Sequence, residues 1–300
     1  MTNILIVGTG ALGTLFAARL SAAGNNVTLL GTWPEALTAL NQHGARLILA
    51  EGSELRAPVQ ATDTPANCSQ VDLALVLVKA WQTKRAAQQL AACLPATSVA
   101  VTLQNGLGNR EILIEALGQT RVILGVCTYG ATLLAPGVAQ LGGEGLLALE
   151  DTPRSREIQT LLQRAGFQVN LVADAEALAW GKVIINAAIN PLTALLRVPN
   201  GELLQRPAAR ALMQALAEET AAIAQAHGIQ LPFKDPLAAV ENVAQRTASN
   251  RSSMLQDIQR GAPTEIEAIC GAVTRIAQTH GISAPLNWAM WRLIDALRGA

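Results

Sequence analysis

A lysine and two asparagines recur every four residues in an otherwise apolar stretch. The stretch runs Ala-Trp-Gly-Lys-Val-Ile-Ile-Asn-Ala-Ala-Ile-Asn-Pro from Ala179, and the polar residues are Lys182, Asn186 and Asn190. In an α-helix a step of four residues advances about 40°, so the three side chains share an arc of about 80°. An ammonium can donate a proton or stabilise negative charge, and buried asparagines must be hydrogen-bonded. The pattern favours a functional polar stripe over a plain solvent-facing one.

Three glycines near the N-terminus have the spacing of a phosphate-binding turn. Gly8, Gly10 and Gly13 form the pattern G-x-G-x-x-G directly after a short apolar run. A helix-period stretch, Ala11–Ala23, and a second predicted strand, Asn26–Leu30, follow at the distances of a dinucleotide-binding unit. The helix N-terminus would offer free N–H groups to a pyrophosphate. The alternative is a glycine-rich turn of some other α/β protein.

Three further polar clusters lie in predicted loops. Gln104–Asn109 follows a strand, and it is either a plain turn or a contact to cofactor or substrate. Ser249–Asp257 has by itself only the composition of a helix N-cap region. In the third cluster, we expect Thr264 to cap a long helix and Glu267 to close a capping box, with Glu265 in the first turn.

The first half of the chain alternates predicted strands with predicted helices. Such alternation is typical of a doubly wound parallel sheet, the Rossmann-type α/β architecture. The expected strands after the first two are an edge region at 44–61, then 71–78, 98–103, 122–126 and a glycine-rich β-hairpin or extended pair at 138–149. The expected helices after the first are 33–43, 81–93, 108–117 and 153–165.

The second half has almost only helical periodicity. We expect helices at 175–194, 207–227, 236–246, 265–280 and 286–297. The chain therefore divides into a dinucleotide-binding domain at 1–170 and an all-helical substrate and catalytic domain at 171–300. A ligand site is expected between them, at the carboxyl ends of the strands.

Composition narrows the class of protein. The chain has 22 basic and 22 acidic residues, so neither a nucleic-acid partner nor an acidic tail is indicated. No stretch is expected to reach the length of a membrane span, and no secretory signal is seen. The cysteines and histidines show no metal-site spacing, and we expect no metal. The four scattered cysteines indicate buried thiols in a reducing compartment, which suggests a cytoplasmic protein.

Together these motifs resemble the ketopantoate reductase (2-dehydropantoate 2-reductase) family over essentially the whole chain. The lysine–asparagine stripe with its following proline and the Ser-Ser-Met-Leu-Gln-Asp phrase are the specific matches. The matching phrases are Gly8–Gly13, Val78–Gln82, Gln104–Gly108, Lys182–Ala194, Asn200–Leu203, Ser252–Asp257 and Thr264–Ile266.

The resemblance implies an NAD(P)H-dependent reduction of 2-dehydropantoate to (R)-pantoate, a step of pantothenate and coenzyme A biosynthesis. It implies that Lys182 is the general acid and that Glu265 contacts the substrate hydroxyl and the lysine. The implied substrate-binding residues are Asn105, Asn186, Asn190, Asn250 and Ser253. The implied cofactor-binding residues are Gly8, Thr9, Gly10, Ala11, Leu12, Gly13, Thr32, Lys79 and Asn105.

The region after the second predicted strand departs from the family pattern. Members that use NADPH commonly place an arginine there, but this chain reads Gly31-Thr-Trp-Pro-Glu35. Thr32 is expected to cap the next helix, whose N-terminus could hold a 2′-phosphate, although Glu35 opposes it. We expect NADP as cofactor, and NAD stays open because the arginine is absent.

Two other functions are compatible with the sequence. One is a related reductase acting on another branched 2-oxo acid. The other is a catalytically silent protein that senses the nicotinamide ratio, although such a sensor has no need of both Lys182 and Glu265. The expected partner is a small 2-oxo acid. The oligomeric state is not readable, and a homodimer stays open.

Overall fold

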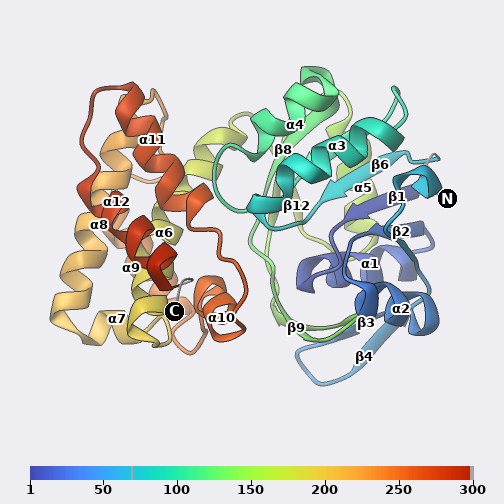
Figure 1. The fold of residues 1–300 in the computed structure, drawn as a ribbon, viewed down its shortest axis with the longest axis horizontal. Coiled ribbons are helices and arrows are strands. Elements are labelled where there is room, and N and C mark those ends of the chain that lie inside the picture. Colours follow the sequence, from blue (N-terminus) through green and yellow to red (C-terminus); the bar gives the residue numbers. More distant parts are fainter. Residues whose placement is uncertain (69, 298–300) are drawn as a thin grey trace. The chain divides into compact units, whose positions relative to one another are not determined.

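The computed structural model describes residues 1–68 and 70–297, which form two compact units (Figure 1). The first unit contains Met1–Gln104 and Asn109–Ala175. The second contains the short loop Asn105–Gly108 and the chain from Glu176 onwards. The chain thus passes into the second unit for four residues, returns, and passes into it again after Ala175.

An eight-stranded sheet forms the centre of the first unit. Its order is β12-β11-β8-β7-β6-β1-β2-β5, and every neighbouring pair is parallel except β11 and β8. The chain builds outwards from β1 through β2 to β5, then returns to the other side of β1 with β6. The strands are β1 Asn3–Val7, β2 Asn26–Leu30, β5 Gln60–Thr62, β6 Leu73–Val76, β7 Val99–Thr102, β8 Val122–Cys127, β11 Leu147–Glu150 and β12 Val169–Val172. The predicted doubly wound sheet is confirmed, and its switch point lies between β1 and β6.

Alternate side chains of β1 point to opposite faces of the sheet, and both faces are buried. Ile4 and Ile6 belong to one core with helix α1 (Ala11–Ala22), whereas Leu5 and Val7 belong to another with α3 and α4. A strand covered on both faces reads as a continuous apolar run, which is why β1 was recognisable. The other helices of the unit are α2 Pro34–His43, α3 Thr83–Cys93, α4 Asn109–Leu117 and α5 Ser155–Arg164, with short 3₁₀ turns η1 Pro65–Cys68, η2 Ala80–Gln82 and η3 Gln119–Arg121.

A second sheet of four strands corrects two sequence expectations. Its order is β4-β3-β10-β9, with β3 Ala45–Ile48, β4 Glu54–Ala57, β9 Gly130–Ala135 and β10 Val138–Gly143. The expected edge strands at 44–61 therefore divide between two sheets. Of the β-hairpin or extended pair expected at 138–149, both strands are present as β10 and β11, but they form no hairpin, because β10 pairs with β9 and β11 joins the main sheet. Short strands carry too little periodicity to show their partners.

Arg19 anchors α1, the helix that follows the glycine turn. Its guanidinium is 9% exposed and lies over the rings of Tyr129 and Phe167, at 5.4 and 5.2 Å from their centroids. It also pairs with Glu144. Phe16, one turn before Arg19, stacks on Phe167 at 4.4 Å. Cation–π and stacking contacts of this kind fix the helix that carries the phosphate-binding turn.

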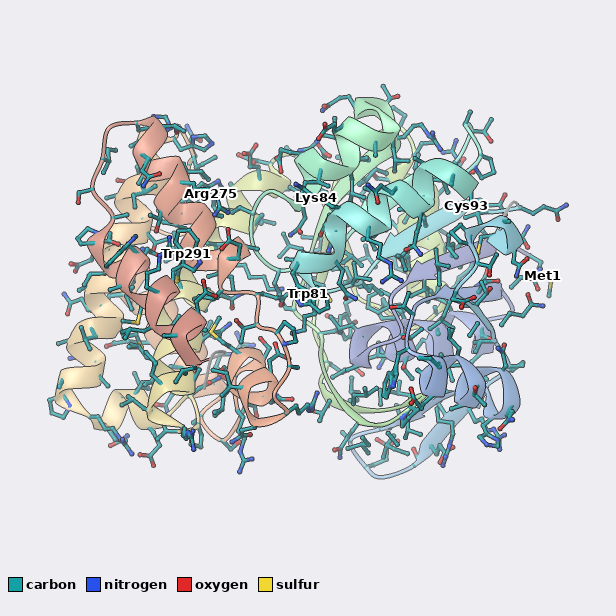
Figure 2. The ribbon with its side chains drawn as sticks, viewed as in Figure 1. Met1, Trp81, Lys84, Cys93, Arg275 and Trp291 are labelled. Atoms are coloured by element: carbon teal, nitrogen blue, oxygen red, sulfur yellow. The ribbon has the colours of Figure 1, made fainter. Side chains whose placement is uncertain are left out.

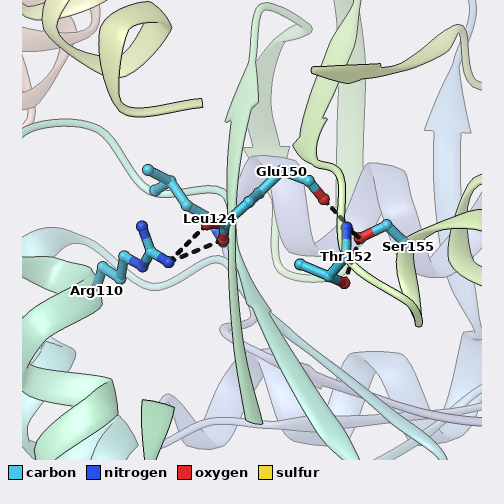
Figure 3. Close-up of polar contacts among 5 residues, drawn as sticks. All are labelled: Arg110, Leu124, Glu150, Thr152 and Ser155. Carbon is cyan, nitrogen blue, oxygen red and sulfur yellow. Dashed lines mark hydrogen bonds and ion pairs between the residues drawn. The ribbon is translucent and has the colours of Figure 1, made fainter. Parts of the chain in front are cut away.

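Glu150, the last residue of β11, connects this strand to α4 and α5 (Figure 3). Its two carboxylate oxygens lie 2.8 and 2.9 Å from Arg110 Nη2 at the start of α4. The Ser155 hydroxyl at the start of α5 donates to the Glu150 carbonyl at 2.6 Å. Both charged side chains are largely buried, so salt screens this pair less than an exposed ion pair.

The second unit contains helices packed around α6, Ala175–Leu196. Trp180, Val183, Ile184, Ala187 and Ala188 of α6 lie in its core. The remaining helices are α7 Glu202–Gln205, α8 Pro207–Ala226, α9 Pro236–Arg246, α10 Ser253–Gln259, a π-helical turn η4 Glu267–Gly271, α11 Ala272–Thr279 and α12 Pro285–Ala296. The predicted helical second half is confirmed, and the short α7 and α10 are additions.

The expectation that no stretch reaches the length of a membrane span is wrong for α6. This helix has 22 residues and is apolar enough by composition to cross a bilayer. Of its most apolar window, 67% is buried within the structure. Its apolar surface is therefore covered by the neighbouring helices of its own unit.

None of the four cysteines forms a disulfide, and all four are buried. Cys68 and Cys93 are hydrogen-bonded to each other, which raises the pKa of the Cys68 thiol. Burial, with a smaller effect of the nearby Glu219 charge, raises the pKa of the Cys270 thiol. The Cys68 and Cys270 thiols are packed in the cores and are held in their neutral form.

Glu219 on α8 caps the N-terminus of α12. Its carboxylate accepts from Leu286 N at 3.0 Å, and from Asn287 N and Nδ2 at 2.8 and 2.9 Å. We expect Glu219→Ala to lower the free energy of unfolding by about 2 kcal/mol, because two helix-end amides lose a charged acceptor. Urea unfolding followed by tryptophan fluorescence measures this. Glu218→Ala, an exposed neighbour on the same helix, is the control, and an equal loss there would contradict the assignment.

Candidate active site

The Gly8–Gly13 turn leaves the N-terminus of α1 open. Gly8 has φ +126°, which favours glycine, and its N–H donates to Leu30 O at 2.9 Å. Gly10 is the N-cap residue, α1 has no side-chain cap, and a Cβ on Gly10 would meet nothing within 4 Å. A Cβ on Gly13 would lie 2.0 Å from Gly8 O. The turn therefore presents bare backbone at a helix end, as phosphate binding requires.

The other residues of this turn that are predicted to bind the cofactor are half-buried or buried. Ala11 and Leu12 are half-buried in the first turn of α1. Thr9 is 7% exposed, and its side chain packs against Gly31, where a Cβ would lie 2.5 Å from Thr9 Cγ2. This close contact joins the glycine turn to the residue that follows β2.

The expected cap at Thr32 is wrong. The N-cap residue of α2 is Trp33, and Pro34 occupies the first helical position, where its missing N–H costs nothing. Thr32 is exposed and precedes the helix. No side chain caps α2.

Lys79 lies in the loop after β6, the strand that neighbours β1 at the switch point. It is half-buried and is the N-cap residue of η2. Gln104 Nε2 holds this loop by donating to Val78 O at 3.0 Å and to Thr83 Oγ1 at 2.8 Å. Thr83 Oγ1 also donates to Asn109 Oδ1 at 2.7 Å.

Sequence reasoning missed this network. Gln104 is recognisable in the sequence as part of a polar cluster, whereas nothing in the sequence distinguishes Thr83, which is fully buried. A buried threonine in the first turn of a helix has no sequence signature of its own. The network matters because it connects the carboxyl ends of two neighbouring strands of the parallel sheet.

Lys182, Asn186 and Asn190 lie in one uninterrupted helix, α6. Lys182 and Asn186 are half-buried, and Asn190 is only 8% exposed. A stripe that faced solvent along its whole length is inconsistent with this burial. The three polar groups therefore lie on a partly sheltered face, and the more buried end is the asparagine end.

Two small contacts shape α6 around this stripe. A Cβ on Gly181 would lie 2.7 Å from Pro232 Cγ, so glycine lets the loop before α9 approach the helix beside Lys182. Beyond Pro191, the Thr193 hydroxyl lies 2.7 Å from Ser252 Oγ and 3.0 Å from the Ile189 carbonyl. The second contact ties the end of α6 to the start of α10.

Glu265 is 6% exposed and is brought together with Asn105. Asn105 Nδ2 donates to Glu265 Oε2 at 3.0 Å, although the two residues are 160 positions apart. Asn105 belongs to the loop that the contacts assign to the second unit. A buried carboxylate requires such donors, because its charged form loses hydration.

The capping box expected at Thr264 and Glu267 is wrong. Thr264 Oγ1 accepts from Ile266 N at 3.5 Å, only two residues on, and Glu267 pairs with Arg275 instead of reaching back. The helix begins with the π-helical turn η4, which has no side-chain cap. Glu265 lies just before this turn.

Ser252, not Ser253, is the N-cap of α10. Its Oγ accepts from Leu255 N at 3.1 Å, and its side chain is buried. The side chains of Ser253 and Asn250 are both exposed. Neither side chain forms the N-cap of α10, and Asn250 uses its backbone carbonyl to accept from Asn200 N at 3.0 Å.

In residues 1–68 and 70–297, no three histidine, cysteine, aspartate or glutamate side chains gather as a metal site would require. Two of the histidines end helices. His227 is the C-cap residue of α8 and His280 that of α11, and their Nδ1 and Nε2 atoms lie 2.8 Å apart.

A doubly wound sheet in this strand order, with an open glycine turn at its switch point, defines the class of dinucleotide-binding proteins. Within that class, both halves of the chain match one family. Residues 4–154 match the model of ketopantoate reductase PanE/ApbA, and residues 174–298 match that of the ketopantoate reductase PanE/ApbA C terminal. The chain belongs to the ketopantoate reductase family.

Curated relatives are similar over nearly their full length. The 2-dehydropantoate 2-reductase of Archaeoglobus fulgidus is 35% identical, with 97% of this chain and 96% of the relative covered. The 2-dehydropantoate 2-reductase of Halobacterium salinarum is 34% identical, with 95% of each covered.

Solved structures share the fold. A PanE/ApbA family ketopantoate reductase from Ralstonia eutropha has a TM-score of 0.93 at 29% identity, with 99% of both chains covered. D-mandelate dehydrogenase in complex with NADH and anilino(oxo)acetate has a TM-score of 0.92 at 24% identity, again over 99% of both chains. The second likeness concerns the fold alone.

Replacing each of the two adjacent serines should have a different effect on the free energy of unfolding. We expect Ser252→Ala to lower the free energy of unfolding by about 1 kcal/mol, because the N-cap of α10 and the contact with Thr193 are lost. Ser253→Ala should change it by less than about 0.5 kcal/mol, as is usual for an exposed side chain. Urea unfolding of both variants measures these changes. A larger loss of stability in Ser253→Ala than in Ser252→Ala would contradict the observed cap.

Proposed function

We propose that this chain reduces 2-dehydropantoate to (R)-pantoate, with Lys182 as the general acid. The observation that carries the proposal is the sheltered stripe of Lys182, Asn186 and Asn190 on α6, in a chain that matches the family over both halves. A reduced nicotinamide, when bound, supplies a hydride to the 2-oxo carbon. The related reductases are named for this reaction.

The residues of the first unit fit a dinucleotide. Gly10 leaves open space where a Cβ would stand, and the uncapped first turn of α1 supplies N–H donors for a pyrophosphate. Thr9, Ala11, Leu12 and Lys79 would line the remaining cofactor surface. Lys79 follows β6, which neighbours β1 at the switch point where such ligands bind.

Lys182 completes the reduction at the substrate oxygen. As C2 accepts the hydride, its oxygen gains negative charge, which an ammonium stabilises and then neutralises by giving up a proton. The product is a hydroxyl group, and the amine of Lys182 regains its proton from solvent.

Glu265 and the asparagines would hold the substrate for this step. Glu265, fixed by Asn105, accepts the substrate hydroxyl, while Asn186 and Asn190 donate amide hydrogens from the stripe. Ser253 and Asn250 have exposed side chains that suit a contact with the substrate carboxylate. We accordingly expect Ser253→Ala to raise KM for the oxo acid while NADPH affinity stays unchanged.

The function is tested with purified protein, NADPH or NADH, and a panel of branched 2-oxo acids. Oxidation of the cofactor with 2-dehydropantoate as the preferred substrate is the expected result. Faster turnover of another 2-oxo acid would point to a related reductase. Cofactor binding without turnover of any acid would indicate a sensor of the nicotinamide ratio.

Replacing Lys182 tests the proton donor. We expect Lys182→Met to lower kcat by about two to four orders of magnitude, the loss typical of an acid that also stabilises charge. The fold and NADPH affinity should persist, because methionine keeps much of the stem volume. Lys182→Arg should restore little, since a guanidinium does not release its proton near neutral pH.

The measurement is kcat/KM against pH for the wild type and both variants. Melting temperature and NADPH titration are the controls that separate chemistry from folding. Near-normal turnover in Lys182→Met would make a bound water or Glu265 the proton source instead.

The residues after β2 bear on the choice between NADPH and NADH. We infer a small preference for NADPH, because the family uses it but the 2′-phosphate here meets only backbone and hydroxyl donors around Thr32. Thr32→Arg should raise the NADPH-to-NADH ratio of kcat/KM by about tenfold, the value of one charge-assisted hydrogen bond. Thr32→Gln is the neutral control. A wild-type preference for NADH would overturn this inference.

A further inference from the structure

The turn that follows Glu265 is π-helical over five residues, Glu267–Gly271. Gly271 N donates to Ile266 O, five residues back, at 3.1 Å. Such a turn contains one more residue than an α-helical turn and shifts the pairing of the carbonyls beside it. The helix then continues as α11.

This shift changes the partner of the Ala268 carbonyl. In a regular α-helix, Ala268 O would accept from the N–H of Ala272. Here the Ala272 N–H donates to Ile269 O instead. Ala268 O accepts from Leu107 N at 2.8 Å, a donor from the loop Asn105–Gly108. The π-helical turn therefore presents a backbone acceptor to that loop.

Glycine at position 106 allows the loop to come this close. Gly106 has φ +84°, and a Cβ there would lie 2.5 Å from Ala268 O and 2.6 Å from Ala268 Cβ. Neither neighbour is the free end of a long side chain, so neither can move aside cheaply. Any other residue at 106 would push the loop off the turn.

The same loop carries the amide that contacts Glu265. Asn105 Nδ2 donates to Glu265 Oε2, and two residues later Leu107 N donates to Ala268 O. Glu265 and Ala268 are three residues apart, and Ala268 N donates to Glu265 O at 3.1 Å. The loop is thus fastened to the glutamate segment by one side-chain bond and one backbone bond.

The far end of the π-helical turn is also fixed. A Cβ on Gly271 would lie 3.1 Å from Trp291 Cε2, so the indole packs directly on the backbone of the turn. Arg275, which is labelled with Trp291 in Figure 2, lies 5.5 Å from the Trp291 ring. Arg275 also pairs with the Glu267 carboxylate and donates to the Glu267 carbonyl. The turn therefore has little freedom to relax into an α-helix.

We propose that the π-helical turn and Gly106 are positioning devices that fix the Glu265 carboxylate for the reaction. The turn supplies Ala268 O to the loop, Gly106 lets the loop reach it, and the loop then holds Asn105 on Glu265. This inference rests on the proposed function of Glu265. Gly106, Ala268 and Gly271 need not touch substrate or cofactor, because they act through Asn105 and Glu265.

Gly106→Ala tests the proposal against a matched control, Gly108→Ala. The two glycines have similar φ, +84° and +88°, so alanine is strained equally at both, but a Cβ on Gly108 would meet nothing within 4 Å. We expect Gly106→Ala to lower kcat by about 10- to 100-fold, as misplacement of a reacting group does. Gly108→Ala should lower it much less, and the Kd for NADPH should be unchanged in both.

Hydrogen exchange of the Leu107 amide gives a readout without turnover. We expect its protection to fall in Gly106→Ala and to persist in Gly108→Ala. If the wild type turns over no 2-oxo acid, the proposed function fails, and this exchange still decides whether the turn fixes the loop. Equal losses of kcat in both glycine variants, or unchanged Leu107 protection in Gly106→Ala, would overturn the proposal. Should Gly106→Ala not fold, Asn105→Ala, which removes the amide that donates to Glu265, must lower kcat while the protection of the Leu107 amide persists.

Discussion

The hydrogen bond between Asn105 and Glu265 is the interaction on which the candidate site depends. A carboxylate that is 6% exposed needs donors, and this one obtains a donor from a loop 160 residues earlier in the chain. The loop follows β7 directly, yet its contacts lie with the helical unit. The loop after β7 therefore supplies a hydrogen-bond donor to Glu265. Glycine at position 106 is needed for the loop to come this close.

Glycines also allow close contacts around the Gly8–Gly13 turn. Gly8, Gly13 and Gly31 each stand where a Cβ would come within about 3 Å of a neighbouring atom, and these contacts bring β1, α1 and the end of β2 together. Where backbone must approach backbone, side chains cannot supply the binding groups, so the N–H donors of α1 remain for the phosphates. Arg19, buried between aromatic rings at the other end of α1, holds that helix in place.

The sequence allowed prediction of the sheet and the long helices because buried strands and amphipathic helices have strong periodicity. It did not reveal the π-helical turn, since an extra residue in one turn leaves the apolar pattern almost unchanged. Nor could it choose between Ser252 and Ser253 as the cap, because both are good N-caps and only the contact with Thr193 decides. Thr32 failed as a cap because Pro34 set the helix start one residue later than expected.

Lysine is rare in this chain, and most of its basic residues are arginines. The chain has only four lysines, at 79, 84, 182 and 234, among 22 basic residues. Arginines such as Arg110 and Arg275 pair with carboxylates, a task for a planar group that always keeps its charge. A lysine ammonium can give up a proton in each turnover, whereas a guanidinium keeps its proton near neutral pH. The proposed role of Lys182 as proton donor therefore agrees with the presence of a lysine, and not an arginine, at this position of the apolar helix α6.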